Sequence, residues 1–427
     1  MALGRRRRTD PGNAVESLGS VTCPSGDVFV FDFGLLRLWS GDRPPVLDGD
    51  VVPPEVAAQA NASDDFEISG RDAVTVAAAL DLAAVKGRYA FDLPDHGESL
   101  SKRVATICQE RSLHARVQRI GRMPHRRRLE RLLDDDPTGA EVPFHGVWGV
   151  AVRGVPRSRS LPVLGRRMDD DGPDAGRWHS VWVLCDERPP VSSIEAGYVL
   201  VDEARLMFAD PRALDLWRND EALDGLADLE FWGRDAVAAA DVTGASPVDA
   251  SQSNVFGWLD RPVAEVVRLA RQLEELRSDA ALKFVIDFRP HDHHHQMLRL
   301  ARTTPTEAGT ITLDGFLVTG LFTTWGDGAF PVYRDVAADG SLCRIRVELG
   351  APEIVQRTRR FEELWFGSFP RWRSPRRGSP TTVSPSGGFT ERRPIGTRTA
   401  AGGCSPAMRR RSTSMTPPTP SSSRCVS

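Results

Sequence analysis

Several kinds of residue and segment are scarce in this sequence, and each absence excludes a class of protein. Cysteine occurs 6 times in 427 residues, with no Cys-x-x-Cys pair, so we expect no disulfide framework and a reducing, cytoplasmic compartment. No apolar run approaches the roughly 20 residues of a membrane helix, so we expect no membrane contact. The arginines at residues 5–8 precede no apolar segment, which argues against a secretory signal.

Lysine is also scarce, at Lys86, Lys102 and Lys283 alone, whereas arginine is abundant. The net charge of -3 provides no overall field that would attract nucleic acid, so we do not expect a nucleic-acid partner. Hydrophobic residues make up 40% of the chain and charged residues 26%, a composition typical of soluble globular domains. The length allows two or more such domains.

Composition divides the chain into four predicted regions. Residues 1–25 are polar, with Gly, Pro and Arg, and residues 366–427 are rich in Ser, Pro and Arg, so we expect both to be disordered. Between them we expect an N-terminal α+β domain at residues 26–138 and a larger β-rich domain at residues 139–365. The abrupt change of composition near Arg371 also raises the hypothesis that the tail is out-of-frame sequence, which an intact reading frame would refute.

The N-terminal domain has its clearest pattern at residues 87–120. Residues 87–93 and 114–120 have strand-like composition, and the helical segment between them, residues 98–111, places apolar side chains on one face. A right-handed crossover would make the two strands parallel. We therefore predict a small ferredoxin-like sheet within a protein of the α+β class.

The strongest β pattern lies at residues 314–350. Asp-Gly turns at residues 325–328 and 338–340 separate β-rich runs, because glycine accepts positive φ there without steric cost. The last run alternates apolar with charged residues, which indicates one buried and one exposed face. We predict three antiparallel strands here, in a β-rich antiparallel domain with flanking helices.

Four histidines and two aspartates lie within residues 287–295. On a helix, His291, His294 and His295 would share a face; on a strand, His293 would replace His294. Either set could offer three imidazoles to Zn²⁺, but the His-Glu-x-x-His spacing of metallohydrolases is absent. A polar loop that opens a helix is the alternative. Our candidate ligands for a divalent metal are Asp287, His291, His294 and His295.

The turn at residues 325–328 is a second candidate site. Asp327 could act as a general acid or base beside Trp325. The alternative is a structural turn, in which the aspartate bonds its own backbone and the tryptophan covers the core. The candidate surface around this turn consists of Trp325, Gly326, Gly328 and Tyr333.

The run Trp-Gly-Asp-Gly-Ala-Phe-Pro-Val-Tyr at residues 325–333, followed by Asp339-Gly340 and an alternating strand, resembles the C-terminal end of a bacterial family of unknown function, domain family four-two-four-one. Residues 198–210 are similar to an earlier strand block of that family. The resemblance covers roughly residues 144–350. It implies a globular α+β domain and carries over no activity.

Two functions follow as expectations. Because no catalytic motif is assembled in the sequence, the first is a non-catalytic binding or interaction protein, immunity- or regulator-like, with a protein partner. The alternative is a metal-dependent hydrolase that uses the histidine cluster at residues 291–295 together with Asp327.

Overall fold

The computed structural model describes residues 14–47, 53–80, 82, 85–94, 97–144, 147–168, 174–248, 254–352, 354 and 356. Its several antiparallel sheets and flanking helices form an α+β protein, as the sequence predicts. The predicted disorder of residues 366–427 lies outside the described residues. Among those residues, no helix has the length and apolar character to cross a membrane.

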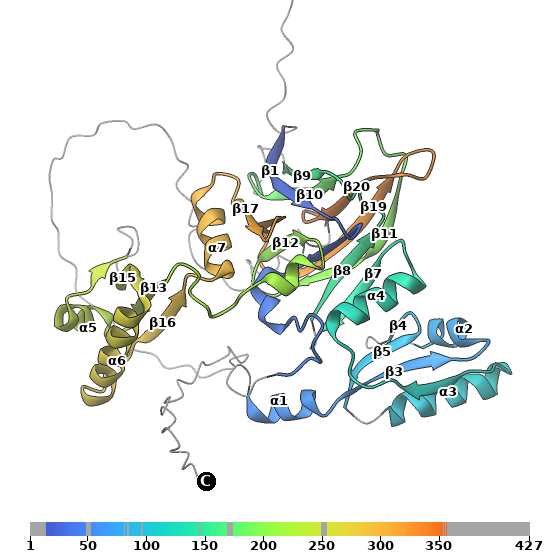
Figure 1. Ribbon diagram of the computed structural model, residues 1–427, viewed down its shortest axis with the longest axis horizontal. Coiled ribbons are helices and arrows are strands. Elements are labelled where there is room, and N and C mark those ends of the chain that lie inside the picture. The colour runs from blue at the N-terminus through green and yellow to red at the C-terminus, as the bar shows by residue number, and fades with distance from the viewer. Residues whose placement is uncertain are drawn as a thin grey trace, which may run out of the picture.

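Two six-stranded antiparallel sheets form the centre of the molecule (Figure 1). The first sheet contains, in spatial order, β1 (Val15–Thr22), β9 (Ser160–Arg167), β10 (Trp178–Leu184), β20 (Leu342–Glu348), β19 (Gly328–Val336) and β11 (Ser192–Val201). The second contains β17 (Ala308–Leu313), β18 (Phe316–Phe322), β12 (Arg205–Ala209), β2 (Asp27–Phe31), β8 (Val147–Arg153) and β7 (Ala140–Phe144).

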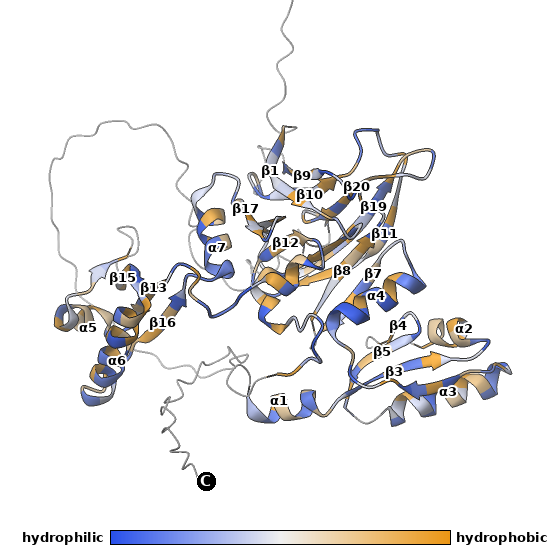
Figure 2. Cartoon of the chain, viewed as in Figure 1, coloured by the Kyte–Doolittle hydropathy of each residue, from blue (hydrophilic) through white to orange (hydrophobic). Residues whose placement is uncertain are grey.

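The two sheets pack face to face around one apolar core. In β2, Val28 and Val30 point into this core, while Phe29 and Phe31 point to the opposite face of the second sheet. That opposite face is covered by α4 (His125–Asp135) and α7 (His293–Thr303). A central strand buried on both faces is apolar throughout. Figure 2 shows hydrophobic residues along these strands and hydrophilic residues over α4.

A smaller sheet, unit 1, follows β2 in the chain. It contains, in spatial order, β4 (Val85–Lys86), β5 (Tyr89–Leu93), β3 (Asp64–Ser69) and β6 (Arg116–Arg119), with α2 (Ala73–Ala78) and α3 (Glu98–Arg111) packed against it. The strand β3 is antiparallel to both β5 and β6, so these two are parallel to each other, as predicted. The order is that of the ferredoxin-like fold, and the sequence reading missed β3.

A second small sheet, unit 2, repeats this arrangement in the C-terminal half. It contains, in spatial order, β14 (Ser246–Pro247), β15 (Val255–Pro262), β13 (Leu226–Trp232) and β16 (Val285–Pro290), with α5 (Ala236–Thr243) and α6 (Val263–Asp279). Its chain order and its strand order match those of unit 1. The sequence prediction included only one such unit.

The whole described chain consists of two copies of one arrangement. β1 to β10, which we call repeat 1, run as two strands, a 3₁₀ helix, unit 1, a helix and four strands; β11 to β20, repeat 2, do the same with unit 2. The 3₁₀ helices are η2 (Phe33–Leu38) and η3 (Ala213–Leu216), and repeat 1 alone has α1 (Pro54–Asn61). Equivalent strands occupy mirrored places in both sheets. A pseudo-two-fold axis therefore passes between β2 and β12 and between β10 and β20.

Short sequence matches support the duplication. Gly-Arg-Asp-Ala-Val occurs at residues 70–74 and again at 233–237. In both copies the aspartate accepts a hydrogen bond from the backbone N–H that precedes the last strand of its unit, that of His114 at 2.7 Å and of Lys283 at 2.8 Å. The glycine of the motif has φ of +122° at Gly70 and +139° at Gly233, and it lies against that same backbone. A side chain would therefore clash there.

The residues after the second strand of each repeat also match, as Asp-x-x-x-Leu-x-Leu-Trp at residues 32–39 and 210–217. Asp32 accepts hydrogen bonds from the N–H groups of Asp202 and Glu203, in the β11–β12 turn of repeat 2. Asp210 accepts one from Ser25, in the β1–β2 turn of repeat 1. Each repeat thus stabilises a turn of the other.

Asp32 makes the stability of the fold dependent on pH. Burial raises the pKa of Asp32 from 3.8 to about 6, although three backbone N–H groups favour its charged form. Between pH 3.8 and about 6, the folded chain holds a proton that the unfolded chain has lost. The free energy of unfolding therefore falls as pH rises through this range. We expect urea titrations to show this fall in the wild type and a smaller one in Asp32→Asn. Equal slopes in the two proteins would refute the assignment.

The sheets divide the chain differently from the predicted boundaries. β1 lies inside residues 1–25, which were expected to be disordered, yet it pairs with β9 and buries Leu18 and Val21. β2, expected in the N-terminal domain, pairs with β8 and β12 of the sandwich. The elements of unit 1 span residues 64–119. Strand pairing connects distant segments, which composition along the chain does not report.

Candidate metal centre and adjoining pocket

Three potential metal ligands converge at the end of unit 2, namely Asp228, His291 and His295. Asp228 lies in β13, His291 directly follows β16, and His295 is in the first turn of α7. Asp292 caps this helix by accepting a hydrogen bond from the His295 N–H at 2.7 Å. The four-residue spacing then brings the two imidazole rings into a stack, with centroids 4.3 Å apart.

The donor atoms face one another across a small space. His291 Nε2 lies 3.1 Å from one oxygen of Asp228, and His295 Nε2 lies 3.6 Å from the other. His295 Nε2 is buried and has no hydrogen-bond partner among the described residues. Ligand atoms around a tetrahedral zinc ion are roughly 3.3 Å apart, given bonds of 2.0–2.1 Å. The separations therefore fit a zinc ion with small adjustments of the side chains.

Carboxylates surround His291 on both sides. Its Nδ1 lies 2.9 Å from Asp224, and Asp260 lies 3.8 Å from its Nε2. Burial opposes the charge of His291, but the bonds to Asp224 and Asp228 outweigh it and raise its pKa. Burial lowers the pKa of His295. A carboxylate on the outer nitrogen of a ligating histidine fixes its ring orientation in metal sites, which is the role available to Asp224.

Two of the predicted ligands lie elsewhere, which corrects the predicted ligand set. His294 Nε2 lies 2.8 Å from Arg205, on the side of α7 that faces the sandwich. Asp287 pairs with Arg289 at 2.8 Å. Because α7 begins at His293, His291 lies before the helix, and its ring stacks on the ring of His295. Neither of the two predicted geometries, helix or strand, applies to the whole segment.

The turn at residues 325–328 makes the contacts expected of its structural alternative. Trp325 is buried and donates its Nε1–H to the carbonyl of Trp178 at 2.7 Å, and Asp327 accepts a hydrogen bond from the Ala204 N–H at 3.0 Å. Tyr333 lies beneath the guanidinium of Arg346. Instead of joining two paired strands, as predicted, this turn carries the chain from β18 in one sheet to β19 in the other. Asp327 therefore lies with the β11–β12 turn and is not one of the three residues whose ligand atoms converge.

Gly326 and Gly328 belong to this same turn. Gly326 has φ of +74°, which favours glycine, and a side chain there would meet open space. Gly328 is the first residue of β19. The two glycines serve the turn that the sequence predicts, while the second predicted turn joins β19 to β20 with a Gly340 N–H to Ala337 carbonyl bond of 2.9 Å.

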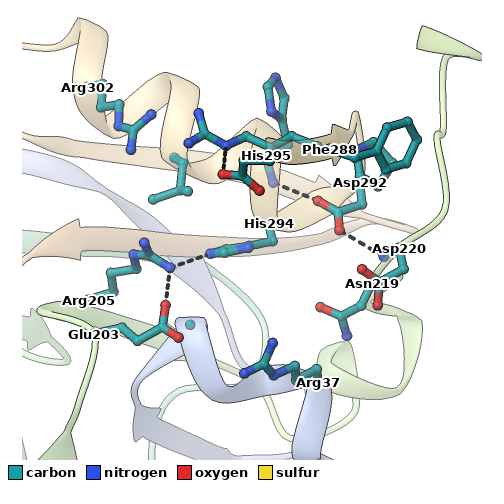
Figure 3. A pocket seen from close by; sticks show the side chains of 15 residues that line it. Arg37, Glu203, Arg205, Asn219, Asp220, Phe288, Asp292, His294, His295 and Arg302 are labelled. Carbon is teal, nitrogen blue, oxygen red and sulfur yellow. Dashed lines mark hydrogen bonds and ion pairs between the residues drawn. The ribbon is translucent and has the colours of Figure 1, made fainter. Parts of the chain in front are cut away.

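A pocket of about 200 Å³ adjoins the three ligands and shares His295 with them (Figure 3). Four arginines line it, namely Arg37 from η2, Arg205 from β12, Arg289 from β16 and Arg302 from α7, together with the carboxylates of Glu203, Asp220, Asp287 and Asp292. Arg205 bonds both Glu203 and His294. Burial, together with Arg205 and Arg37, lowers the pKa of His294 to about 3, so this imidazole is neutral and accepts the Arg205 N–H.

In repeat 1, the place equivalent to the ligand cluster contains two aspartates and an arginine. Asp65 and Asp228 both lie five residues before the first glycine of the Gly-Arg-Asp-Ala-Val motif. Asp92 and Asp260 both have positive φ, and each donates its N–H to that aspartate, at 3.1 and 2.8 Å. In repeat 1 the two carboxylates enclose a cation, the buried guanidinium of Arg128.

Arg128 pairs with both carboxylates of that acidic pair. Its Nη2 lies 2.9 Å from Asp65 and its Nη1 2.8 Å from Asp92, and the guanidinium lies over the ring of Phe91. Gln296 occupies the corresponding place in repeat 2, as the fourth residue of an equally long helix. The two histidines are present there instead. The repeated pentapeptide was the signal in the sequence that could have led to Asp228.

Comparison with protein-family models, with curated proteins and with solved structures finds no match to this chain. The family resemblance of the hairpin at residues 325–333 therefore stays a prediction.

Proposed function

We propose that this protein binds a divalent transition-metal ion, zinc by its donor set, between Asp228, His291 and His295. The observation that carries the proposal is the meeting of three donor atoms within 4.8 Å of one another where repeat 1 holds a guanidinium. Two imidazoles and one carboxylate are ligands that zinc prefers. A metal ion would supply the positive charge that Arg128 supplies in the other copy.

The proposal predicts about one zinc ion per chain, as three ligands from one cluster imply. Untagged protein, purified without a chelating column, should retain it after dialysis. The His291→Gln, His295→Gln double variant should lose it, because both imidazoles are removed. The His114→Gln variant is the matched control, since His114 is an exposed histidine in unit 1. Elemental analysis gives the stoichiometry, and circular dichroism checks that each variant folds.

Zinc retained by the double variant would contradict this site, and so would zinc lost equally from the His114→Gln control. An absence of stoichiometric zinc, manganese or iron in the wild type, even after dialysis against each ion, would contradict metal binding altogether.

Hydrolysis is the second candidate function, and one feature favours it. Three protein ligands leave a fourth zinc position for water, as in catalytic rather than structural sites. The general base would come from a carboxylate near the ligands such as Asp260, because Asp327 lies with the β11–β12 turn. The non-catalytic interaction role stays a prediction beside it.

A further inference from the structure

The pocket beside the metal ligands contains arginines without partners. Arg37 and Arg302 have no hydrogen bond or ion pair with any described residue, whereas Arg205 bonds Glu203 and His294 through its Nη1. The Nε atoms of Arg37 and Arg205 are buried and unbonded. Figure 3 shows Arg37, Arg205 and Arg302 around the space that His294 also lines. Buried donors of this kind are costly unless a ligand accepts their hydrogen bonds.

The pseudo-two-fold symmetry gives each of these arginines an equivalent position in the other repeat. Arg205 and Asp27 are the first residues of β12 and β2, and Arg302 and Asp134 are the second-last residues of α7 and α4. Arg37 and Asp215 are the same position in the repeated Asp-x-x-x-Leu-x-Leu-Trp segment. Arg37, Arg205 and Arg302 therefore correspond to aspartates, whereas the fourth arginine of the pocket, Arg289, pairs with Asp287 and Glu230.

The three equivalent aspartates are neutralised by the protein itself. Asp215 pairs with Arg126, the residue equivalent to His294, and Arg126 also pairs with Asp42. Asp27 and Asp134 pair with Arg153 at 3.0 and 3.3 Å. The same region is thus closed by internal ion pairs in one copy. In the other copy the signs are reversed, and Arg37 and Arg302 have no ion-pair partner in the part of the chain that the structure describes.

We propose that the pocket formed by Arg37, Arg205 and Arg302 binds a phosphate group. Guanidinium groups from three elements converge on a volume of about 200 Å³, below the roughly 300–1,000 Å³ of drug-sized sites, which suits a small oxyanion. Arginine presents planar pairs of N–H donors that match phosphate oxygens. The dianion would also supply the negative charge that Asp27, Asp134 and Asp215 supply at the symmetry-related place. The inference does not depend on bound metal, because none of the three arginines belongs to the ligand cluster.

Calorimetric titration of the metal-free full chain with inorganic phosphate, at constant ionic strength, tests the proposal. We expect saturable binding of one phosphate, and binding at least tenfold weaker in Arg37→Gln and in Arg302→Gln, because each loses charge-assisted hydrogen bonds. Arg302 is exposed at the edge of the pocket, so its variant should fold even if Arg37→Gln does not. Arg268→Gln, which removes an exposed arginine on α6, is the control and should bind like the wild type.

Acetate distinguishes the two kinds of oxyanion. Tighter binding of acetate than of phosphate would overturn the phosphate assignment in favour of a carboxylate. Absence of saturable phosphate binding, or equal affinity in the wild type and both pocket variants, would overturn the site. The same titration with the Asp228→Asn variant, whose side chain does not line the pocket, should leave phosphate binding within about threefold, which separates a failure here from a failure of the metal proposal.

Discussion

Replacing Arg128 with methionine will lower the free energy of unfolding by about 3–5 kcal/mol, the usual cost of removing one partner from a buried ion pair. Arg128 and Asp65 are both fully buried, and the guanidinium bonds Asp65 and Asp92 together. Methionine retains an apolar stem near Phe91 but removes the guanidinium between the two carboxylates, and Arg122, 3.5 Å from Asp92, is the ion-pair partner that remains. The loss therefore arises from charge rather than from packing.

The loss should depend on pH. Burial already raises the pKa of Asp65, and Arg128 is the main influence that lowers it. Without the arginine, the folded state binds a proton more readily than the unfolded chain, so the variant regains stability as pH falls. Chemical denaturation of both proteins at neutral and at acidic pH measures the difference.

Arg127→Met is the matched control for Arg128→Met. Arg127 is the preceding residue of α4, with a side chain 60% exposed and an ion pair to Glu130 on the helix surface. Such pairs contribute about 0.2–0.5 kcal/mol, so little stability should be lost. Comparable losses in the two variants would show that α4 is sensitive to any substitution and that the buried pair has no special weight.

Zinc will stabilise the wild-type protein by about 2.7 kcal/mol at a free concentration one hundred times its dissociation constant, by mass action on the folded state. The gain requires that zinc bind the folded chain at Asp228, His291 and His295 and bind the unfolded chain weakly. Asp228→Asn should remove most of it, because the carboxylate between the two imidazoles is lost. Urea unfolding with zinc, and again after addition of a chelator, provides the measurement.

Asp65→Asn is not a suitable control for this experiment, because it disrupts the Arg128 pair. Asp241→Asn, at an exposed position in α5 of the same unit, removes a carboxylate away from the ligands and should keep the full gain. A gain that persists in Asp228→Asn would place the zinc at another site, and our assignment would then be wrong.

The Arg128 ion pair and the proposed zinc site occupy equivalent places in the two repeats. Both units bring an aspartate from the first strand and an aspartate with positive φ from the third strand into contact. Repeat 1 adds a permanent cation through Arg128, which makes the site part of the core. Repeat 2 adds two histidines, which can exchange a proton for a metal ion. If the proposed zinc site is correct, this place has a structural role in repeat 1 and a ligand-binding role in repeat 2.

Much of the local structure follows from the sequence. The alternation at residues 342–348 predicts one buried face of β20, and the pattern at residues 87–120 predicts the parallel relation of β5 and β6. The histidine cluster at residues 291–295 is the most distinctive chemistry in the sequence, and His291 and His295 belong to the candidate metal centre. These features depend on side-chain periodicity and on residue type, which neighbouring residues establish between them.

The tertiary structure alone decided which residues meet. Asp228 is 63 positions from His291, and no periodicity connects them. His294 contacts Arg205 on another side of α7, and Asp327 lies in a turn that passes between the two sheets. Neither is therefore one of the three converging ligand residues. The sequence also contained the duplication, in a repeated pentapeptide, but only the strand pairing showed that equivalent positions hold opposite charges. Periodic patterns report which face of an element is buried, whereas pairing between distant strands and helices determines what that face contacts.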